Sequence, residues 1–239
     1  MTTSYTIEGG NVINTALWER YVPTADNAVD WKAYISFRGR HNDSLGKRIR
    51  MLNLAQLARQ TYVPGIFAEC GCFRGHSTHI IATMMRLTGR KDPLYVFDSF
   101  QGLSPVQPED LTDDPRASSI QDALRAADRP LFAASLDDVK TNLAEHTNIQ
   151  YFPGWIPERF ADVADETFAF VHIDVDLYAP MRDCLAFFYP RLAKGGMIQI
   201  DDYNFIDWPG CNKAVNEFLA DNPPTLFVQL PLGGAFLVK

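Results

Sequence analysis

Two apolar runs that end in paired carboxylates constrain the fold of this chain more than any other feature. Residues 170–173 (FVHI) lead into Asp174 and Asp176, and residues 195–200 (GGMIQI) lead into Asp201 and Asp202. Each run is typical of a buried strand. If the two strands are parallel neighbours, their four Asp side chains converge at one edge of the sheet.

Carboxylates packed this closely repel one another, and their pKa values rise unless a cation lies between them. Oxygen ligands without Cys or His beside them suit Mg²⁺, Mn²⁺ or Ca²⁺ better than zinc. The alternative is a pair of polar strand ends, because Asp is common in turns after strands. We expect one of these hard divalent cations at this edge of the sheet.

Strand-like and helix-like segments alternate from residue 66 onward. Expected strands cover residues 66–71, 94–98, 149–152, 170–173 and 195–200, with helices near 77–87, 117–127, 135–145, 181–192 and 215–219. Two final runs, 226–230 and 235–238, indicate a hairpin around Gly233 and Gly234. This order predicts an α/β fold with a doubly wound, mainly parallel sheet and one antiparallel edge strand.

The first 60 residues differ from the rest because they carry no strand signal. Residues 14–21 and 30–35 are rich in aromatic side chains and read as irregular. Apolar residues at helical spacing predict a helix over residues 43–58, which Asp43 or Ser44 can cap. We interpret residues 1–60 as a helical cap or lid within the same domain as residues 61–239.

Composition excludes several classes of protein. The chain has 239 residues, 46% of them hydrophobic and 21% charged, and a net charge of −7, which is ordinary for a globular domain. The absence of a basic patch argues against nucleic acid, and the absence of an apolar span or leader argues against a membrane.

Cysteine spacing favours reduced thiols and a cytoplasmic location. The aromatic N-terminal segment suggests a homo-oligomer.

A glycine-containing segment follows the first expected strand. It reads Glu69-Cys-Gly71-Cys-Phe-Arg-Gly75 and opens a helix. Glycines let a backbone approach a ligand closely, and a helix N-terminus offers free N–H groups. The segment is not the GxGxxG dinucleotide fingerprint. Asp98 ends the next strand, where a carboxylate can accept ribose hydroxyls; the alternative is a turn cap beside Ser99.

These motifs carry a resemblance. The Glu69 to Gly75 segment followed by residues 96–103 (VFDSFQGL) resembles the S-adenosylmethionine (SAM) site of class I methyltransferases. With residues 152–155 (FPGW), 173–178, 189–196 and 201–203, the order of motifs over about 65–220 resembles the macrocin O-methyltransferase family. That resemblance implies a Rossmann-like, seven-stranded fold and the SAM- and Mg²⁺-dependent methylation of sugar hydroxyls in antibiotic biosynthesis.

The resemblance also implies roles for individual residues. Asp174, Asp201 and Asp202 would be the metal ligands, and Asp176 the general base, although spacing alone leaves the base open between Asp174 and Asp176. A cation lowers the pKa of a bound hydroxyl, a carboxylate takes its proton, and positioning aligns the methyl transfer. The cofactor residues would be Glu69, Gly71, Gly75, Asp98, Ser99, Ser135 and Trp155. His172 is expected in the core or behind the site.

Two other functions compete with a methyltransferase acting on a sugar-containing small molecule. A glycosyltransferase also holds its metal through an Asp-x-Asp motif after an apolar strand, but the glycine segment and Asp98 fit it less well. A non-catalytic SAM-binding protein would need no metal cluster. A related methyltransferase acting on a cephalosporin-like scaffold is a nearer alternative, and the acceptor stays open.

Overall fold

A seven-stranded sheet organises the protein. The structure, a computed structural model, describes residues 5–8, 11–14, 25–41, 43–126 and 130–239, with side chains from residue 28 on. Five neighbouring strands run parallel in the order β5-β4-β3-β6-β7. Their bounds are β3 Ile66–Cys70, β4 Leu94–Asp98, β5 Ile149–Pro153, β6 Phe168–Ile173 and β7 Leu192–Ile200.

The C-terminal hairpin completes the sheet beside β7. It consists of β8, Leu226–Gln229, and β9, Ala235–Val238. Strand β9 pairs antiparallel with both β7 and β8. The predicted doubly wound, mainly parallel sheet is therefore confirmed, with antiparallel pairing confined to this side. The antiparallel strand itself lies one place in from the edge, and β8 forms the edge.

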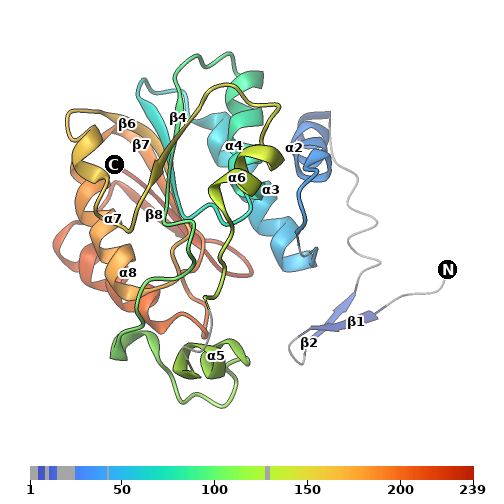
Figure 1. The fold of residues 1–239 in the computed structure, drawn as a ribbon, viewed down its shortest axis with the longest axis vertical. Helices are drawn as coiled ribbons and strands as arrows, with labels where there is room; N and C mark the ends of the chain where they lie inside the picture. The colour runs from blue at the N-terminus through green and yellow to red at the C-terminus, as the bar shows by residue number, and fades with distance from the viewer. Residues whose placement is uncertain (1–4, 9–10, 15–24, 42, 127–129) are drawn as a thin grey trace.

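Helices cover both faces of the sheet (Figure 1). On one face lie α2 (Ala25–Ser36), α3 (Leu45–Gln60) and α4 (His76–Leu87), whose apolar side chains share a core with Phe67 and Phe170. On the other lie α7 (Tyr178–Arg191) and α8 (Pro209–Asp221), around Phe188. Shorter elements are η1 (Pro108–Asp110), α5 (Ile120–Ala126), α6 (Leu136–Asn142) and η2 (Phe160–Val163).

Local sequence explains where several helices begin and end. The Ser44 side chain accepts a hydrogen bond from the Lys47 N–H at 3.2 Å, which confirms the predicted cap of α3. Helix α4 is followed by Gly89 at φ 75°, the left-handed conformation that commonly ends helices. Pro209 opens α8 at a position where its missing N–H costs nothing.

The N-terminal region corrects two expectations. Strands β1 (Tyr5–Glu8) and β2 (Asn11–Asn14) form an antiparallel hairpin, so the prediction of no strands before residue 60 is wrong. The sequence did contain a turn signal, Gly9-Gly10, between the two runs. Residues 30–35, read as irregular, belong to α2, because Tyr34 packs in the core on α4. Residues 15–24 lie outside the described part of the chain.

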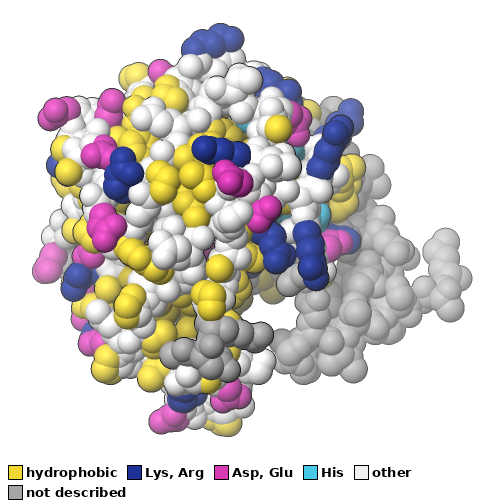
Figure 2. Space-filling model, in the orientation of Figure 1, with side chains coloured by type: hydrophobic (Ala, Val, Ile, Leu, Met, Phe, Trp, Pro, Cys, Tyr) yellow, Lys and Arg dark blue, Asp and Glu magenta, His cyan; other side chains and the backbone are white. Residues whose placement is uncertain are grey.

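The surface is mixed in chemical character. On the face in Figure 2, acidic and basic side chains are interspersed with apolar ones. Among the described residues, no helix combines the length and apolarity that crossing a bilayer requires. All four cysteines are buried and form no disulfide.

The order of the strands creates a crevice. The chain leaves β3 for β4 on one side and leaves β6 for β7 on the other, so connections diverge between the adjacent strands β3 and β6. In open α/β sheets, ligands bind outside the carboxyl ends of the strands at such a point. The glycine segment and the first acidic pair both lie here.

Candidate active site

A cavity of about 820 Å³ opens at the carboxyl ends of β3, β4, β6 and β7. It is lined on one side by the segments after β3 and β4, and on the other by the acidic strand ends and α3. The lining residues that bear on function are Lys47, Arg50, Gly71, Asp98, Ser99, Trp155, Asp174, Asp176, Asp201 and Asp202. One cavity thus joins the two motif groups that the sequence singled out.

The turn after β3 lies directly against the turn after β6. The Gly71 N–H donates to the Phe97 carbonyl and the Asp174 N–H donates to the Cys70 carbonyl, each at 2.9 Å. Gly71 has φ 81°, and a Cβ at this position would lie 1.8 Å from the Asp174 carbonyl oxygen. Glycine is therefore required here both by conformation and by space.

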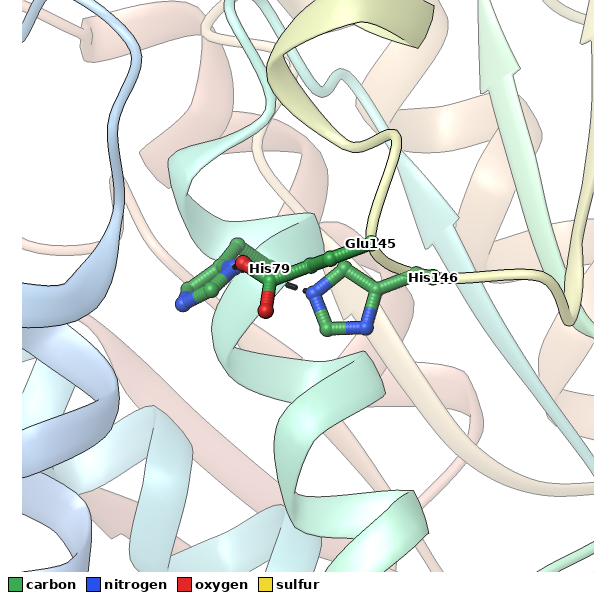
Figure 3. A group of neighbouring side chains, drawn as sticks. All are labelled: His79, Glu145 and His146. Atoms are coloured by element: carbon green, nitrogen blue, oxygen red, sulfur yellow. Dashed lines mark hydrogen bonds and ion pairs between the residues drawn. The ribbon is translucent and has the colours of Figure 1, made fainter.

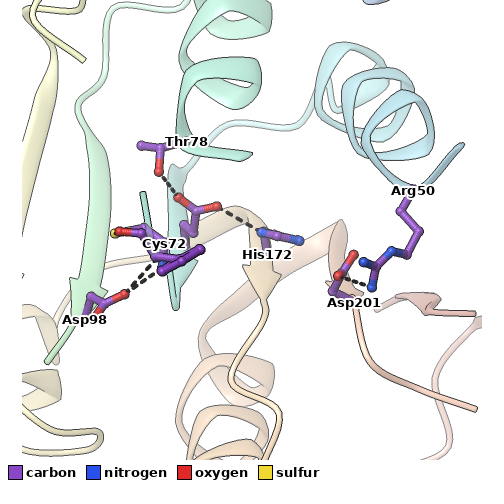
Figure 4. A network of polar contacts seen from close by, with 8 residues as sticks. Arg50, Cys72, Thr78, Asp98, His172 and Asp201 are labelled. Carbon is purple, nitrogen blue, oxygen red and sulfur yellow. Dashed lines mark hydrogen bonds and ion pairs between the residues drawn. The ribbon is translucent and has the colours of Figure 1, made fainter. Parts of the chain in front are cut away.

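The Asp98 carboxylate ties together the loops after β3 and β4 (Figure 4). Its Oδ2 accepts from the N–H groups of Cys72, at 2.7 Å, and Phe73, at 3.2 Å. Its Oδ1 accepts from the Phe100 N–H at 2.7 Å. Asp98 thus caps a turn, as the alternative reading expected, and also holds the glycine segment. Asp98 also lines the cavity.

Glu69 lies behind the cavity rather than in its lining. It is fully buried, and its carboxylate accepts from the Thr78 hydroxyl at 2.5 Å and contacts His172 Nδ1 at 3.0 Å (Figure 4). Burial alone would lower the pKa of His172, but the hydrogen bond and charge of Glu69 raise it above its ordinary value. The pair links β3 to β6 below the site, and His172 lies in the core as expected.

The other predicted cofactor residues occupy different places. Ser99 and Trp155 line the cavity. Gly75 begins α4 at φ 88°, where a Cβ would meet Leu143 Cδ1 at 2.9 Å, so it supports the loop from behind. Ser135 is exposed outside the cavity lining and caps α6 by accepting from the Asp138 N–H. Position in a motif does not reveal whether a serine faces the ligand or caps a helix.

Three carboxylates converge on the opposite side of the cavity. Asp174, Asp176 and Asp202 each offer an oxygen within 4.8 Å of the others. The Asp176 N–H also donates to Asp202 Oδ2 at 3.2 Å. Burial and then mutual repulsion raise the pKa of all three carboxyl groups well above the ordinary value. The expected convergence of acidic strand ends is present, with Asp176 inside the group.

Asp201 adjoins this group but is held by a helix from the N-terminal region. Its Oδ2 accepts from Arg50 Nη1 at 2.6 Å (Figure 4), and the Arg50 guanidinium lies 5.2 Å from the Phe205 ring centroid. Lys47, one turn earlier on α3, also lines the cavity. Sequence reasoning missed both basic residues, although their spacing of three on a predicted helix put them on one face.

The donor set fits a hard divalent cation. It offers carboxylate oxygens from two adjacent strands, without imidazole or thiolate among them, and Asp201 keeps its Oδ1 free of the Arg50 contact. The other side fits a nucleoside-containing cofactor, because the Asp98 carboxylate and the backbone of Gly71 border the same space. These arrangements supply a place for two ligands side by side.

Solved structures of two O-methyltransferases share this fold. The O-methyltransferase NovP aligns with a TM-score of 0.67 at 21% identity, over 90% of this chain and 98% of that one. CalS11, a calicheamicin methyltransferase, aligns with a TM-score of 0.59 at 18% identity, over 92% and 95%. At these identities the likeness concerns the fold.

The sequence identifies the family. Residues 38–225 match the family described as macrocin-O-methyltransferase (TylF), and the chain belongs to it. Demethyldecarbamoylnovobiocin O-methyltransferase of Streptomyces niveus is 30% identical over 163 residues, 66% of this chain and 59% of that protein. A tetracenomycin-C rhamnosyl 4'-O-methyltransferase of Streptomyces olivaceus is 28% identical over 65% and 58%. The match thus spans less than two thirds of either relative. Family membership favours a methyltransferase over a glycosyltransferase.

Proposed function

We propose that the protein is a SAM-dependent, divalent-metal-dependent O-methyltransferase that methylates a hydroxyl of a sugar-containing small molecule. The observation that carries this proposal is the shared cavity of about 820 Å³, which places the glycine segment and Asp98 opposite the acidic cluster. A methyl donor and a metal-held hydroxyl need such adjacency, because transfer requires an in-line approach.

On the donor side, SAM supplies a methyl group activated by its sulfonium. The turn at Gly71 lets the backbone approach the cofactor, and Asp98 Oδ1 accepts from a ribose hydroxyl. Trp155 borders the cavity and offers a flat apolar surface for a planar group. Glu69 and Gly75 act from behind, through the contacts that hold β3 and the start of α4. Ser135 caps α6 at the surface, and its contact with the cofactor stays a prediction.

On the acceptor side, Asp174, Asp201 and Asp202 would hold a divalent cation, Mg²⁺ or Mn²⁺, which would lower the pKa of a bound hydroxyl. Arg50 orients the Asp201 carboxylate through Oδ2. Asp176 lies beside the ligands and takes the hydroxyl proton as general base. A second assignment, in which Asp176 is the third ligand, is favoured by its convergence with Asp174 and Asp202, and variants separate the two.

Helix α3 and the segment before it form a wall of the acceptor side. Helix α3 brings Lys47 and Arg50 to the cavity, and Arg40 and Ser44 before it also line the space. We assign to residues 1–60 the role of a cap over the acceptor, in one domain with residues 61–239. A sugar-containing acceptor is inferred from the rhamnosyl group in the name of the Streptomyces olivaceus relative.

A direct assay tests this function. Purified protein is incubated with SAM and a panel of glycosylated and nucleotide-linked sugars, with and without EDTA, and products are followed by mass spectrometry. We expect a mass gain of one methylene for at least one sugar acceptor, loss of turnover in EDTA and recovery with Mg²⁺ or Mn²⁺. Turnover that is unaffected by chelation would disprove the metal mechanism.

A binding assay tests the donor independently of the acceptor. S-adenosylhomocysteine is expected to raise the melting temperature, whereas UDP is expected to leave it unchanged. The opposite response would support a glycosyltransferase. Binding of S-adenosylhomocysteine together with no product from any acceptor would support the non-catalytic alternative.

A further inference from the structure

A second group of ligand-type side chains lies outside the cavity, on the face of α4 that is turned towards the segment after α6. It consists of His79, Glu145 and His146 (Figure 3). His79 Nδ1 lies 2.9 Å from His146 Nε2 and 3.4 Å from Glu145 Oε1. His79 is 1% exposed at its side chain and Glu145 is 46% exposed. The buried imidazole of His79 therefore meets a carboxylate that is exposed to solvent.

The hydrogen bonds of Ser36 fix the tautomer of His79. The Ser36 hydroxyl donates its single hydrogen to the Ala33 carbonyl at 3.0 Å. Its oxygen must then accept from His79 Nε2, which lies 2.9 Å away. The proton of the neutral ring is consequently on Nε2, and Nδ1 presents a lone pair to Glu145 and His146.

This leaves more lone pairs than protons between the three side chains. His146 can donate one N–H to His79 Nδ1, but the Glu145 carboxylate then faces that lone pair without a donor. Across the described part of the chain, Glu145 forms no other side-chain hydrogen bond or ion pair. Burial lowers the pKa of His79, and burial followed by the charge of His79 lowers that of His146 to about 4, so both rings are neutral near pH 7.

We propose that His79 Nδ1, His146 Nε2 and a Glu145 carboxylate oxygen bind a divalent transition-metal ion of the Zn²⁺ type. Two imidazoles and one carboxylate with a position open to solvent are a ligand set that zinc favours. A metal-binding imidazole is usually oriented by a hydrogen bond from its other ring nitrogen. In His79 that bond runs from Nε2–H to the Ser36 hydroxyl, which in turn donates to the Ala33 carbonyl. The all-carboxylate cluster of the cavity selects a different, harder cation.

Metal binding requires one proton shift and a small separation of the rings. His146 transfers its proton from Nε2 to Nδ1, so the ring stays neutral and Nε2 becomes a ligand. Tetrahedral Zn–N bonds of about 2.05 Å put ligand nitrogens roughly 3.3 Å apart. The nitrogens of His79 and His146 are 2.9 Å apart without metal, so the half-buried His146 moves outward by a few tenths of an ångström.

The site would fasten three parts of the protein together. His79 belongs to α4, which starts at the glycine segment, and its ring contacts Ser36 of α2. The backbone N–H of His146 donates to the backbone carbonyl of Leu143, whose side chain packs on Gly75. A bound ion therefore stabilises the loop beside the cofactor side of the cavity without entering it.

Cobalt spectroscopy tests the site. Tag-free protein is stripped with EDTA, dialysed, and titrated with Co²⁺ in excess Mg²⁺, which saturates the carboxylate cluster. We expect one equivalent of Co²⁺ to give the intense visible absorption of a four-coordinate nitrogen-containing site, with displacement by Zn²⁺. His146→Asn and Glu145→Gln are expected to weaken Zn²⁺ binding at least about tenfold.

Matched variants locate the signal. His41→Asn removes a histidine outside the cluster and should leave the spectrum unchanged, as should Asp202→Asn in the cavity. Zn²⁺ should raise the melting temperature of the parent protein and not that of His146→Asn, with circular dichroism confirming that the variant is folded. No absorption in the parent, or equal Zn²⁺ affinity in His146→Asn, would identify the group as a hydrogen-bonded histidine pair and overturn the proposal. Neither result depends on methyltransferase activity.

Discussion

Gly71 and Asp174 meet backbone to backbone where β3 and β6 end. A Cβ on Gly71 would lie 1.8 Å from the Asp174 carbonyl oxygen, and the Asp174 N–H donates to the Cys70 carbonyl at 2.9 Å. The proposed cofactor loop and Asp174, a proposed metal ligand, are consequently positioned by the same contact. A displacement of one must move the other.

Gly71→Ala should destabilise the protein by roughly 2–4 kcal/mol, because it adds a steric clash to a strained φ. Urea denaturation measures the loss. Gly46→Ala is the matched control, since a Cβ there meets nothing within 4 Å and the residue lies in α3. Gly46→Ala should raise the free energy of unfolding, by no more than about 1 kcal/mol. Equal stability of the two variants would contradict the proposed contact.

Asp98→Asn should weaken the binding of S-adenosylhomocysteine, since the carboxylate both holds the N–H groups of Cys72 and Phe73 and faces the cavity. Loss of a charge-assisted hydrogen bond predicts a dissociation constant about 10-fold higher, by calorimetry. Asp137→Asn, in the first turn of α6, changes the same charge away from the cavity. It should bind like the parent protein.

Asp176→Asn and Asp201→Asn distinguish the two assignments of the acidic cluster. If Asp176 is the base, its replacement should lower turnover by about 10²-fold or more with little change in Mn²⁺ affinity, whereas Asp201→Asn should weaken Mn²⁺ binding. Electron paramagnetic resonance of Mn²⁺ measures affinity apart from turnover. Lost Mn²⁺ affinity in Asp176→Asn would instead make Asp176 the third ligand.

Arg50→Gln should destabilise the protein by about 2 kcal/mol, because it leaves Asp201 without its partner. The Arg50 side chain is 23% exposed and that of Asp201 is 4%, which reduces the cost of a fully buried pair. Arg116→Gln breaks an exposed pair with Asp114 and should change stability by less than about 0.5 kcal/mol. Added Mg²⁺ should recover part of the loss only in Arg50→Gln.

Acid should unfold the protein partly through His76. Burial, followed by the charge of Lys47, lowers the pKa of this histidine to about 3. Below the ordinary imidazole pKa of about 6.5, the unfolded chain binds a proton that the folded chain does not. The free energy of unfolding therefore falls as the pH drops from about 6.5 towards 3.

His76→Gln should flatten this acid dependence by up to about 1.4 kcal/mol per pH unit. Urea denaturation at several pH values from 4 to 7 provides the measurement. His41→Asn removes a neighbouring histidine of the same aromatic group, which contributes less than burial and Lys47 to the lowered pKa of His76, and should change the slope far less. If His76→Gln leaves the pH dependence of the free energy of unfolding unchanged, His76 is not a cause of the acid sensitivity.

The sequence predicted the sheet because each strand carries a local signal. The runs before Asp98, Asp174 and Asp201 are apolar and end in polar residues, and parallel pairing brings such ends together. The contact of Arg50 with Asp201 joins residues 151 positions apart. No local pattern encodes that contact, so the role of α3 in the site appears only with the fold.

Other differences arise because tertiary packing overrides local patterns. Residues 30–35 lack a clear helical period, yet Tyr34 is buried on α4 and the segment is helical. The place of β9 inside the sheet depends on how the hairpin docks on β7, which its own residues do not specify. The motif position of Ser135 did not indicate that its side chain caps α6, and its contact with the cofactor stays a prediction.

The three backbone N–H groups gathered by Asp98 have a consequence for the kinetics of the cofactor. They hold the loops after β3 and β4 in one conformation within the protein alone. The conformational entropy of these loops is thus lost when the protein folds, and not when the cofactor associates. We therefore expect the proposed cofactor to meet a preformed surface, so that its association rate depends on diffusion and charge rather than on a slow rearrangement of the loops.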